Sequence, residues 1–332
     1  MKILVTGSSG LIGSAVCPLL EEYGYIVRRF DIQPPSSEIG TTYFRSKELT
    51  DGKDRRRAIK GIDGVIHLAA VSRVLDAELD PSKCIDVNVR GTMELLHDIA
   101  KLDNPPWVIY GSSREVYGTS SKIPVSEDQP LKPVNIYGMS KVVGEYLVSN
   151  YSRLTKRPSV IFRFSNVYGS VYDHSTRVIP AFVRATVTGS AIRIEGEDNI
   201  FDFTHVDDTA NAIRAAVNLI EDGRLAGTEV MNVASGRGTT LMQLANLVRT
   251  ISGVDIPIIK KKLRDFDVNH FIGDPYRLES LLGVRCKIPL YIGIQRLLND
   301  FRTDINRTGY ITEIPGKMSR NMINAVRQEV SL

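Results

Sequence analysis

Three residues of the chain have the types and the spacing that acid–base chemistry on a hydroxyl group requires. Tyr137 and Lys141 stand one helical turn apart, so a helix presents both side chains on one face. A cation close to a phenol favours the phenolate and lowers the phenol pKa from its usual value of about 10. Ser113 lies just past a predicted strand, where its hydroxyl can bind the same substrate oxygen. Together these residues predict a tyrosine base supported by a lysine and a serine.

A glycine-rich turn between the first predicted strand and the first predicted helix has the pattern of a dinucleotide-binding site. Its first glycine permits the tight turn, the second lets the backbone approach a pyrophosphate, and the third lets the helix pack closely on the sheet. The helix N-terminus adds unpaired N–H groups and the positive end of a dipole. The residues predicted to bind the cofactor diphosphate are Gly7, Gly10, Leu11, Ile12 and Gly13.

Asp31, at the end of the second predicted strand, indicates which dinucleotide binds. Its carboxylate can accept both ribose hydroxyls of NAD and would repel the 2′-phosphate of NADP. Arg28 and Arg29 could be taken as NADP ligands, but strand arginines before the acid more often face solvent or the sheet edge, so we expect NAD. An oxidised nicotinamide adds positive charge, which together with Lys141 can bring the phenol pKa toward neutrality.

Around these residues, the first half of the chain alternates short Val- and Ile-rich runs with longer amphipathic stretches. This alternation is typical of βαβ units whose parallel sheet is covered on both faces. We therefore expect an α/β fold: a doubly wound parallel sheet (Rossmann) with a second, smaller C-terminal substrate-binding domain. The expected strands cover residues 2–5, 25–30, 64–68, 107–110 and 158–163, and the expected helices cover 14–22, 87–101, 140–155, 207–220 and 240–251. The expected domains are 1–168 with 200–235 for NAD, 169–199 with 236–310 for the substrate, and a tail of unassigned role at 311–332.

Composition excludes several other classes of protein. The 332 residues are 42% hydrophobic and 24% charged, which is too apolar for a disordered chain. A net charge of +4 is a weak bias, and we expect no binding of nucleic acid. Five scattered histidines predict no metal site, and three distant cysteines indicate a reducing compartment. Without a signal-like or membrane-spanning apolar run, the chain is expected to be cytoplasmic and to bind no membrane.

Several short motifs follow one another in an order that is typical of one enzyme family. Besides the glycine turn and the segment Tyr137–Lys141, they lie at residues 67–70 (HLAA), 88–92 (NVRGT), 112–118 (SSREVYG), 163–169 (RFSNVYG) and 202–208 (DFTHVDD). With them the chain resembles the extended short-chain dehydrogenases/reductases, and among these the NAD-dependent nucleotide-sugar epimerases and dehydratases. The UDP-sugar 4-epimerases are the members it resembles most.

This resemblance implies a reaction in which bound NAD is recycled. Tyr137 would remove the proton of the C4 hydroxyl while the C4 hydride passes to the nicotinamide, and the 4-keto sugar would take the hydride back on its other face. By position, further cofactor contacts are implied for Glu48, Leu49, Leu68, Ala69, Ala70, Tyr137 and Lys141. Substrate contacts are implied for Ser72, Ser113 and Asn166. A homodimer built on the helices around 88–101 and 137–150 is also implied.

Arg114 and Glu115 depart from the pattern of the 4-epimerases, which carry small residues at these two positions. Glu115 could remove the acidified C5 proton of a 4-keto sugar. Arg114, however, stands where 4,6-dehydratases have the acid that elimination needs, and a guanidinium stays protonated. Arg114 could instead bind a uronate or a phosphate of the substrate, or it could have only a surface role. A carboxylate that binds backbone amides is the other interpretation of Glu115.

Phe201 is the second departure, because the family has an arginine there that contacts the diphosphate. The absence of this arginine counts against a decarboxylase, because in the decarboxylases of the family this arginine is assigned to catalysis. The candidates to take over the phosphate contact are Arg177, Arg193 and Arg277.

These residues lead to a ranked set of functions. The first is an NAD-dependent 4-epimerase of UDP-hexose or UDP-hexuronate. The second is a nucleotide-sugar 4,6-dehydratase or C5-active relative that uses Glu115. The third is a non-catalytic NAD-binding regulator, against which the presence of both Tyr137 and Lys141 counts.

Overall fold

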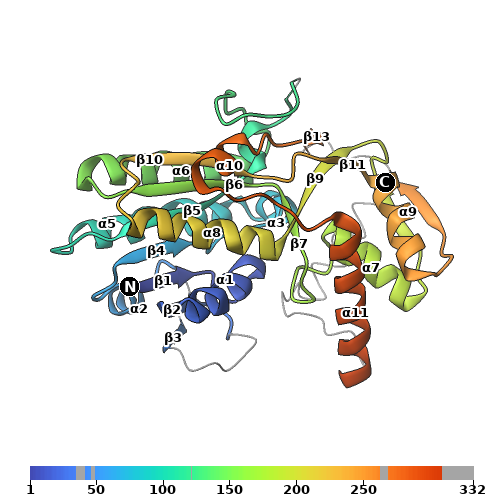
Figure 1. The fold of residues 1–332 in the computed structure, drawn as a ribbon, viewed down its shortest axis with the longest axis horizontal. Coiled ribbons are helices and arrows are strands. Elements are labelled where there is room, and N and C mark those ends of the chain that lie inside the picture. Colours follow the sequence, from blue (N-terminus) through green and yellow to red (C-terminus); the bar gives the residue numbers. More distant parts are fainter. Residues whose placement is uncertain (35–41, 46–48, 121, 262–267, 309–332) are drawn as a thin grey trace.

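The architecture is that of a computed structural model, which describes residues 1–34, 42–45, 49–120, 122–261 and 268–308. Its largest element is a seven-stranded sheet with the order β10-β6-β5-β4-β1-β2-β3, in which every pairing is parallel (Figure 1). The strands are β1 (Lys2–Thr6), β2 (Ile26–Asp31), β3 (Thr42–Arg45), β4 (Gly64–His67), β5 (Trp107–Ser113), β6 (Ser159–Phe164) and β10 (Thr228–Val233). The strand order reverses at β1, and in doubly wound folds ligands bind at the carboxyl ends of the strands beside this point. The predicted fold class is confirmed.

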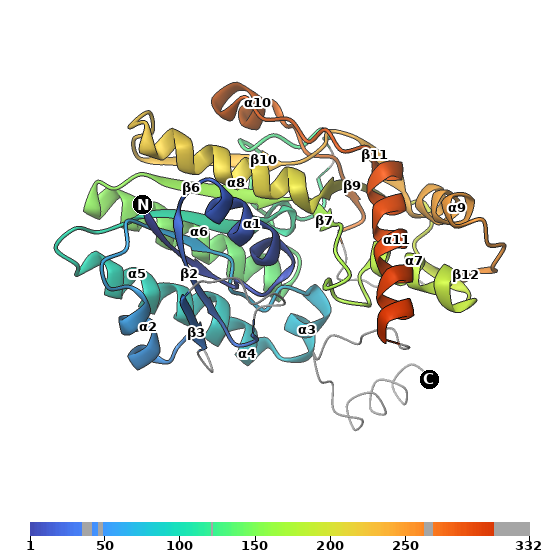
Figure 2. The same ribbon diagram turned by 60° about the horizontal axis from the view of Figure 1, so that its bottom comes forward.

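Both faces of this sheet are buried, which explains the near-continuous apolar runs of its strands. On one face, Ile3 and Val5 of β1 pack against α1 and α8, and on the other face Leu4 packs against α5. Figure 2 shows α8 on one side of the sheet and α2, α3, α4 and α5 on the other. The helices around the sheet are α1 (Leu11–Glu22), α2 (Gly52–Ala58), α3 (Val74–Leu79), α4 (Pro81–Ile85), α5 (Thr92–Ala100), α6 (Ile136–Thr155), α8 (Val206–Glu221) and α10 (Tyr276–Leu282).

A smaller unit lies beside the carboxyl ends of the parallel strands (Figure 1). It contains a four-stranded sheet, a two-stranded sheet and three helices around a separate apolar core. Its elements are β7 (Asn166–Tyr168), β8 (Ile192–Glu195), β9 (Ile200–His205), β11 (Gly238–Thr240), β12 (Ile258–Lys261), β13 (His270–Phe271), α7 (Val178–Thr188), α9 (Leu241–Ser252) and α11 (Leu290–Thr308). The four-stranded sheet includes β7 and β9, whereas α10 packs back against α8. The exact domain boundaries stay a prediction, and the tail 311–332 lies outside the described residues.

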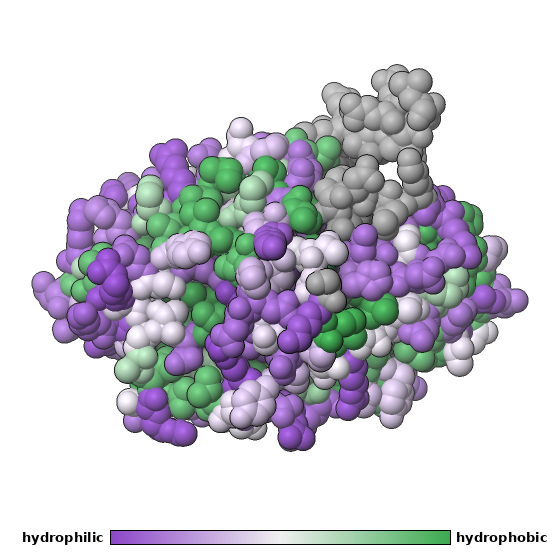
Figure 3. All heavy atoms as spheres, turned by 90° about the horizontal axis from the view of Figure 1, so that it is seen from above, coloured by the Kyte–Doolittle hydropathy of each residue, from purple (hydrophilic) through white to green (hydrophobic). Residues whose placement is uncertain are grey.

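Two short helical segments complete the chain. The first lies where the sequence predicts a regular helix over 87–101, and the second lies where it predicts no helix. A π-helical segment (Asp86–Gly91) leads into α5, and a 3-10 turn (Arg114–Tyr117) follows β5 directly. Among the described residues, no helix has both the length and the apolar character needed to span a bilayer. Hydrophilic and hydrophobic residues are interspersed on the face drawn in Figure 3.

Candidate active site

The glycine turn after β1 has the geometry that its three glycines predict. Gly7 has a φ of +71°, and a Cβ on it would lie 2.6 Å from the backbone nitrogen of Ala69. A Cβ on Gly13 would lie 2.2 Å from the carbonyl oxygen of Gly7, so α1 packs closely against the turn. The nearest neighbour to a Cβ on Gly10 is the same oxygen at 3.4 Å. Gly10 is therefore the open position of the three, where a phosphate can approach the backbone.

The surroundings of the turn fit the diphosphate and ribose of a dinucleotide. Within the described ranges no side chain caps the N-terminus of α1, so its first N–H groups are available to a ligand. The Ser8 hydroxyl is buried and has no hydrogen-bond partner among the described residues. Asp31 accepts hydrogen bonds from the backbone nitrogens of Ser9 at 2.8 Å and Gln33 at 2.9 Å, which fixes its carboxylate beside the turn. Burial raises the pKa of Asp31.

The other predicted cofactor residues fall into two groups. Leu68 to Ala70 follow β4 next to the glycine turn, where the Ala69 nitrogen donates to the Thr6 hydroxyl at 3.3 Å. Leu49 instead is buried in the core against Gly91, and Glu48 lies outside the described residues.

Arg28 and Arg29, the possible NADP ligands, both have partners within the protein. Arg28 donates to the carbonyl oxygens of Ala58 and Lys60 at 2.6 and 2.8 Å. Arg29 is buried and forms an ion pair with Glu21 at 3.0 Å. The Arg28 guanidinium therefore holds the end of α2 onto β2, and the Arg29 guanidinium holds α1 there. Since both arginines have these structural partners, Asp31 is the charged group of β2 that lies beside the turn.

The structure brings Ser113, Tyr137 and Lys141 together at the end of β5. Asn135 caps α6 by accepting from the nitrogen of Gly138 at 2.8 Å, so Tyr137 stands in the first turn of this helix. Lys141 Nζ donates to the Gly111 carbonyl oxygen at 2.8 Å and lies 5.8 Å from the centre of the Tyr137 ring. The Ser113 side chain lies close enough to Tyr137 to lower the pKa of its phenol. The three groups can thus act on one hydroxyl group.

The surrounding protein groups raise the pKa of Tyr137 above its usual value. Burial raises it to about 12, because the Arg177 charge and the Ser113 hydroxyl lower it by less than the loss of water raises it. Burial also lowers the pKa of Lys141 to about 8. The protein groups alone therefore do not bring this phenol toward neutrality, and the lowering expected from Lys141 together with oxidised nicotinamide stays a prediction.

Arg114 and Glu115 form a buried ion pair next to Ser113. Arg114 Nη2 lies 2.9 Å from Glu115 Oε1, and Asn135 Nδ2 donates to Glu115 Oε2 at 2.8 Å. The surface role considered for Arg114 is wrong, since the residue is only 8% exposed. The interpretation of Glu115 as a carboxylate bound by backbone amides is also wrong, since two side chains hold it.

The three arginines considered for the diphosphate lie in different places. Arg177 Nη2 lies 3.4 Å from both oxygens of Ser72, and its charge reaches Tyr137, so Arg177 and Ser72 adjoin the site. Asn166 is half-buried and donates to the carbonyl oxygen of Asp202 at 3.3 Å. Arg193 is exposed on β8.

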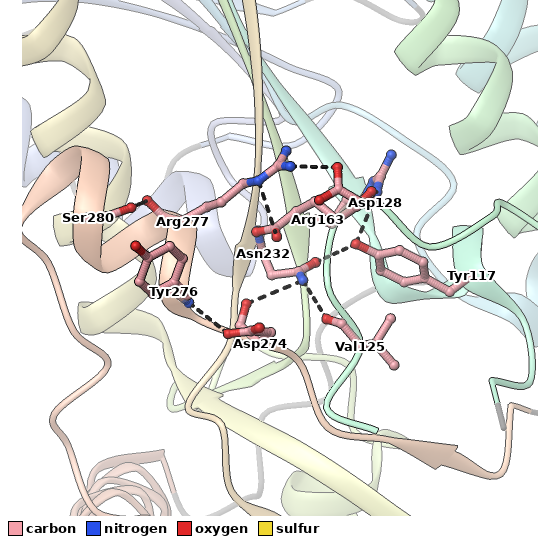
Figure 4. A network of polar contacts seen from close by, with 10 residues as sticks. Tyr117, Val125, Asp128, Arg163, Asn232, Asp274, Tyr276, Arg277 and Ser280 are labelled. Atoms are coloured by element: carbon pink, nitrogen blue, oxygen red, sulfur yellow. Dashed lines mark hydrogen bonds and ion pairs between the residues drawn. The ribbon is translucent and has the colours of Figure 1, made fainter. Parts of the chain in front are cut away.

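Arg277, the third of these arginines, belongs to a polar network that also includes Asn232 and Tyr117 (Figure 4). Its Nη2 contacts Asp128 at 2.5 Å, and its Nε lies 3.7 Å from Glu127. The network continues through Asn232 to Tyr117, whose hydroxyl donates to the Asn232 side chain at 2.7 Å. Arg277 therefore ties the segment around Glu127 to α10, and the backbone of Asn232 ties the same segment to β10.

Sequence reasoning missed Asn135, Asp173 and Phe271. Asn135 had a signal, because asparagine directly before an apolar helical pattern is a typical N-cap. Asp173 had a weak signal, since it stands four residues before Arg177, with which it pairs. Phe271 had none, since it meets Arg114 only through folding of distant segments. Among the described residues, no group of three or more His, Cys, Asp or Glu side chains could hold a metal ion.

Comparison with known proteins decides the family. The sequence profile of the "NAD dependent epimerase/dehydratase family" matches residues 3–234. The chain belongs to this family. A Methanocaldococcus jannaschii protein, whose name provisionally assigns it as a UDP-glucose 4-epimerase, is 32% identical over 92% of this chain and all of its own length. The UDP-glucose 4-epimerase of Lactobacillus helveticus is 28% identical over 86% of this chain and 92% of its own.

Several solved structures have the same fold as this chain, but the activities in their names differ. The Thermotoga maritima UDP-glucose 4-epimerase with UDP-glucose has a TM-score of 0.83 and 28% identity, covering 92% of this chain and 100% of its own. The Bacillus cereus UDP-glucuronic acid 4-epimerase with UDP-glucuronic acid and NAD has a TM-score of 0.83 and 25% identity, covering 91% and 99%. The Streptomyces venezuelae dTDP-glucose 4,6-dehydratase has a TM-score of 0.85 and 25% identity, covering 94% and 100%. These likenesses support an enzyme of the epimerase/dehydratase class and leave the reaction to be proposed from the site.

Proposed function

We propose that this protein is an NAD-dependent UDP-sugar 4-epimerase. The observation that carries the proposal is the meeting of Ser113, Tyr137 and Lys141 at the end of β5, in the same sheet as the glycine turn after β1. Names of relatives support the choice of reaction, because UDP-glucose and UDP-glucuronate 4-epimerases recur among them. Gly7, Gly10, Gly13 and Asp31 would hold the cofactor.

NAD, when bound, supplies the hydride acceptor and, in its oxidised form, a positive charge. Tyr137 takes the proton of the C4 hydroxyl during oxidation and returns one during reduction of the 4-keto sugar. The Ser113 hydroxyl binds the same oxygen, and Lys141 keeps its cation near the phenolate that forms. Because C4 is planar as a ketone, return of the hydride on the other face inverts this carbon.

The substrate's nucleotide needs polar groups close to this centre. Arg177, Ser72 and Asn166 are the residues that we propose for this contact, since Arg177 and Ser72 adjoin Tyr137. Arg277 and Arg193 are not included, because one is held by Glu127 and Asp128 and the other is exposed on β8.

Product analysis tests the proposed reaction. We expect incubation with UDP-glucose, UDP-glucuronate and dTDP-glucose, followed by NMR, to show a product inverted only at C4, with hydrogen at C5 retained in deuterium oxide. A 4-keto-6-deoxy product would overturn the proposal. Hydride recycling leaves the C5–H bond intact, so deuterium at C5 would identify chemistry by Glu115 instead.

A 4,6-dehydratase is the second candidate, because Glu115 lies near enough to Tyr137 for its charge to raise that pKa. Both Glu115 oxygens, however, already accept from Arg114 and Asn135. Glu115 would have to give up its charge-assisted bond to Arg114 before it could take the C5 proton. This cost disfavours dehydration and therefore favours epimerisation. The regulator hypothesis is weaker still, since the three catalytic side chains meet.

We also propose a homodimer in the cytoplasm. The outer faces of α5 and α6, which pack side by side, expose a group of apolar residues that includes Met93, Met139, Val143 and Tyr146. Exposed apolar patches of this kind mark association surfaces. The three cysteines are free thiols, as a reducing compartment predicts.

A double substitution on α6 tests the dimer. We expect Val143→Glu with Tyr146→Glu to convert a dimer into a 36.9 kDa monomer in light scattering, because two charges would face the same patch on a second copy. Leu154→Glu is the matched control, since Leu154 is exposed on the same helix but beyond the patch. A wild-type mass equal to one chain would show that the patch is not a dimer interface.

A further inference from the structure

The imidazole of His67 has a threonine hydroxyl on each of its two nitrogens. His67 is the last residue of β4 and is only 1% exposed. Its Nδ1 lies 2.6 Å from the hydroxyl oxygen of Thr6, the last residue of β1, and its Nε2 lies 2.9 Å from that of Thr92, the first residue of α5. The ring therefore ties two neighbouring strands of the parallel sheet to a helix that covers one face of it.

The other partners of the two hydroxyl groups decide which ring nitrogen carries the hydrogen. Thr92 donates its one hydroxyl hydrogen to the carbonyl oxygen of Asn88 at 2.6 Å, because a carbonyl oxygen can only accept. The Thr92 oxygen must therefore accept from His67, whose Nε2 carries a hydrogen. The Thr6 oxygen accepts from the backbone nitrogen of Ala69 at 3.3 Å, so its own hydrogen can point at Nδ1. A neutral ring protonated on Nε2 satisfies all of these groups.

The surroundings of the ring disfavour its charged form. Burial and, to a smaller extent, the Lys141 cation on α6 lower the pKa of His67 to about 3. The neighbouring ring is that of Tyr110 on β5, with 5.7 Å between the ring centres, and burial raises the pKa of this phenol, so that it stays uncharged. A second hydrogen, on Nδ1, would also turn the Thr6 hydroxyl hydrogen away from its acceptor. His67 therefore keeps one tautomer and holds no charge beside Lys141.

These bonds connect the segment predicted to contact the cofactor with the helix that carries Tyr137. At one end, Ala69 follows β4 beside the glycine turn and is the first donor of the series. At the other end, Asn88 Nδ2 donates to the Ser140 hydroxyl at 2.9 Å, and this hydroxyl donates to the carbonyl oxygen of Tyr137 at 2.7 Å. The His67 ring stands in the middle of the series, so a change at each of its nitrogens affects a different end.

We propose that His67 is a positioning residue of the active site: its neutral ring, protonated on Nε2, holds the segment predicted to contact NAD at a fixed distance from the helix of Tyr137 and takes no part in proton transfer. Hydride transfer and proton transfer occur at neighbouring atoms of the substrate, so both depend on the distance between NAD and Tyr137. Nδ1 acts toward Ala69 and the cofactor, and Nε2 acts toward α6. The role toward Tyr137 rests on the proposed function, whereas the tautomer and the role toward NAD rest on the family and the contacts alone.

Nitrogen-15 NMR of the histidine rings tests the tautomer in the unsubstituted, NAD-loaded full chain. The His67 signals are assigned as those that the spectrum of His67→Asn lacks. From about pH 5 to about pH 9, a range that spans the usual histidine pKa, we expect Nε2 to carry its hydrogen and Nδ1 to carry none. A ring that is protonated on Nδ1, or that gains a charge within this range, would overturn the proposal.

Two amide substitutions separate the two sides of the ring. In His67→Asn the amide ends near the place of Nδ1, where its oxygen can accept from Thr6, and in His67→Gln it reaches the place of Nε2, where its nitrogen can donate to Thr92. We expect His67→Asn to lower kcat about tenfold and to leave the affinity for NAD unchanged, since one buried hydrogen bond is lost on the side of α6. His67→Gln should instead weaken NAD binding about tenfold and leave kcat at saturating NAD unchanged. The KM for the UDP-sugar should stay the same in both variants.

His97→Gln is the matched control, because His97 is exposed on α5, and it should change neither quantity. Equal losses of NAD affinity and of kcat in both variants at position 67 would show that the ring only fills the core. The ring spectrum of the wild-type protein decides the tautomer even where a variant fails to fold. Failure of the proposed function appears separately, as absent C4 inversion by the wild-type protein, while the ring spectrum and the NAD affinities still decide the role of His67.

Discussion

Tyr137→Phe is expected to lower the turnover of UDP-sugars about 10³-fold, within the range that a positioned general base contributes. The substitution removes one oxygen atom and keeps the ring that packs against Ala77 and Cys84. The free energy of unfolding should therefore change little. NAD binding should also persist, because the glycine turn and Asp31 lie on other elements. Initial rates from NMR or a coupled assay, with NAD affinity measured alongside, check this expectation.

The control for this substitution is Tyr276→Phe, which removes a hydroxyl from an exposed tyrosine on α10. It should leave turnover at the wild-type rate. Retention of more than a tenth of the wild-type turnover in Tyr137→Phe would show that another group takes the C4 proton. Glu115 would then be the next residue to test, since its charge reaches Tyr137.

Local sequence signals were sufficient to predict the parallel sheet and the glycine turn expected to bind the cofactor. Buried parallel strands are short and apolar throughout, and the glycine turn is a contiguous segment, so both can be recognised without knowing what packs against them. Helix ends were less accurate. The first helix begins at Leu11 and not at residue 14, because its N-terminus has no capping side chain to mark it. The helix of Tyr137 begins at Ile136 and not at residue 140, since Asn135 caps it.

The smaller sheet and the surroundings of Arg114 could not be predicted, for one physical reason. The strands of this sheet have between two and six residues each and pair over long sequence separations; they are β7, β9, β11 and β13. No periodicity in the sequence therefore predicts them. Arg114 is buried because Phe201 and Phe271 come from two of these strands. The sequence shows the arginine and the phenylalanines, but only tertiary packing places them together.

Arg163→Met is expected to destabilise the protein by about 3–5 kcal/mol, the cost of leaving a buried charge without its partner. Arg163 and Glu145 are each 5% exposed and form a two-pronged ion pair, with nitrogen–oxygen distances of 2.9 and 2.7 Å. Burial alone would lower the pKa of Arg163, but the hydrogen bonds and charge of Glu145 raise it above its usual value. The pair joins α6, which carries Tyr137, to β6. Urea unfolding monitored by circular dichroism measures the loss.

A double variant separates the buried charge from lost packing. Arg163→Met leaves the Glu145 carboxylate with the Ser112 hydroxyl as its side-chain donor, at 2.5 Å. Adding Glu145→Gln removes that charge, so the double variant should be more stable than Arg163→Met alone, as coupled sites require. Arg224→Gln breaks an exposed arginine–aspartate pair instead and should cost less than about 1 kcal/mol. A loss of that small size for Arg163→Met would mean that water or a neighbouring donor compensates Glu145, and the ion pair would not be what fixes the catalytic helix to the sheet.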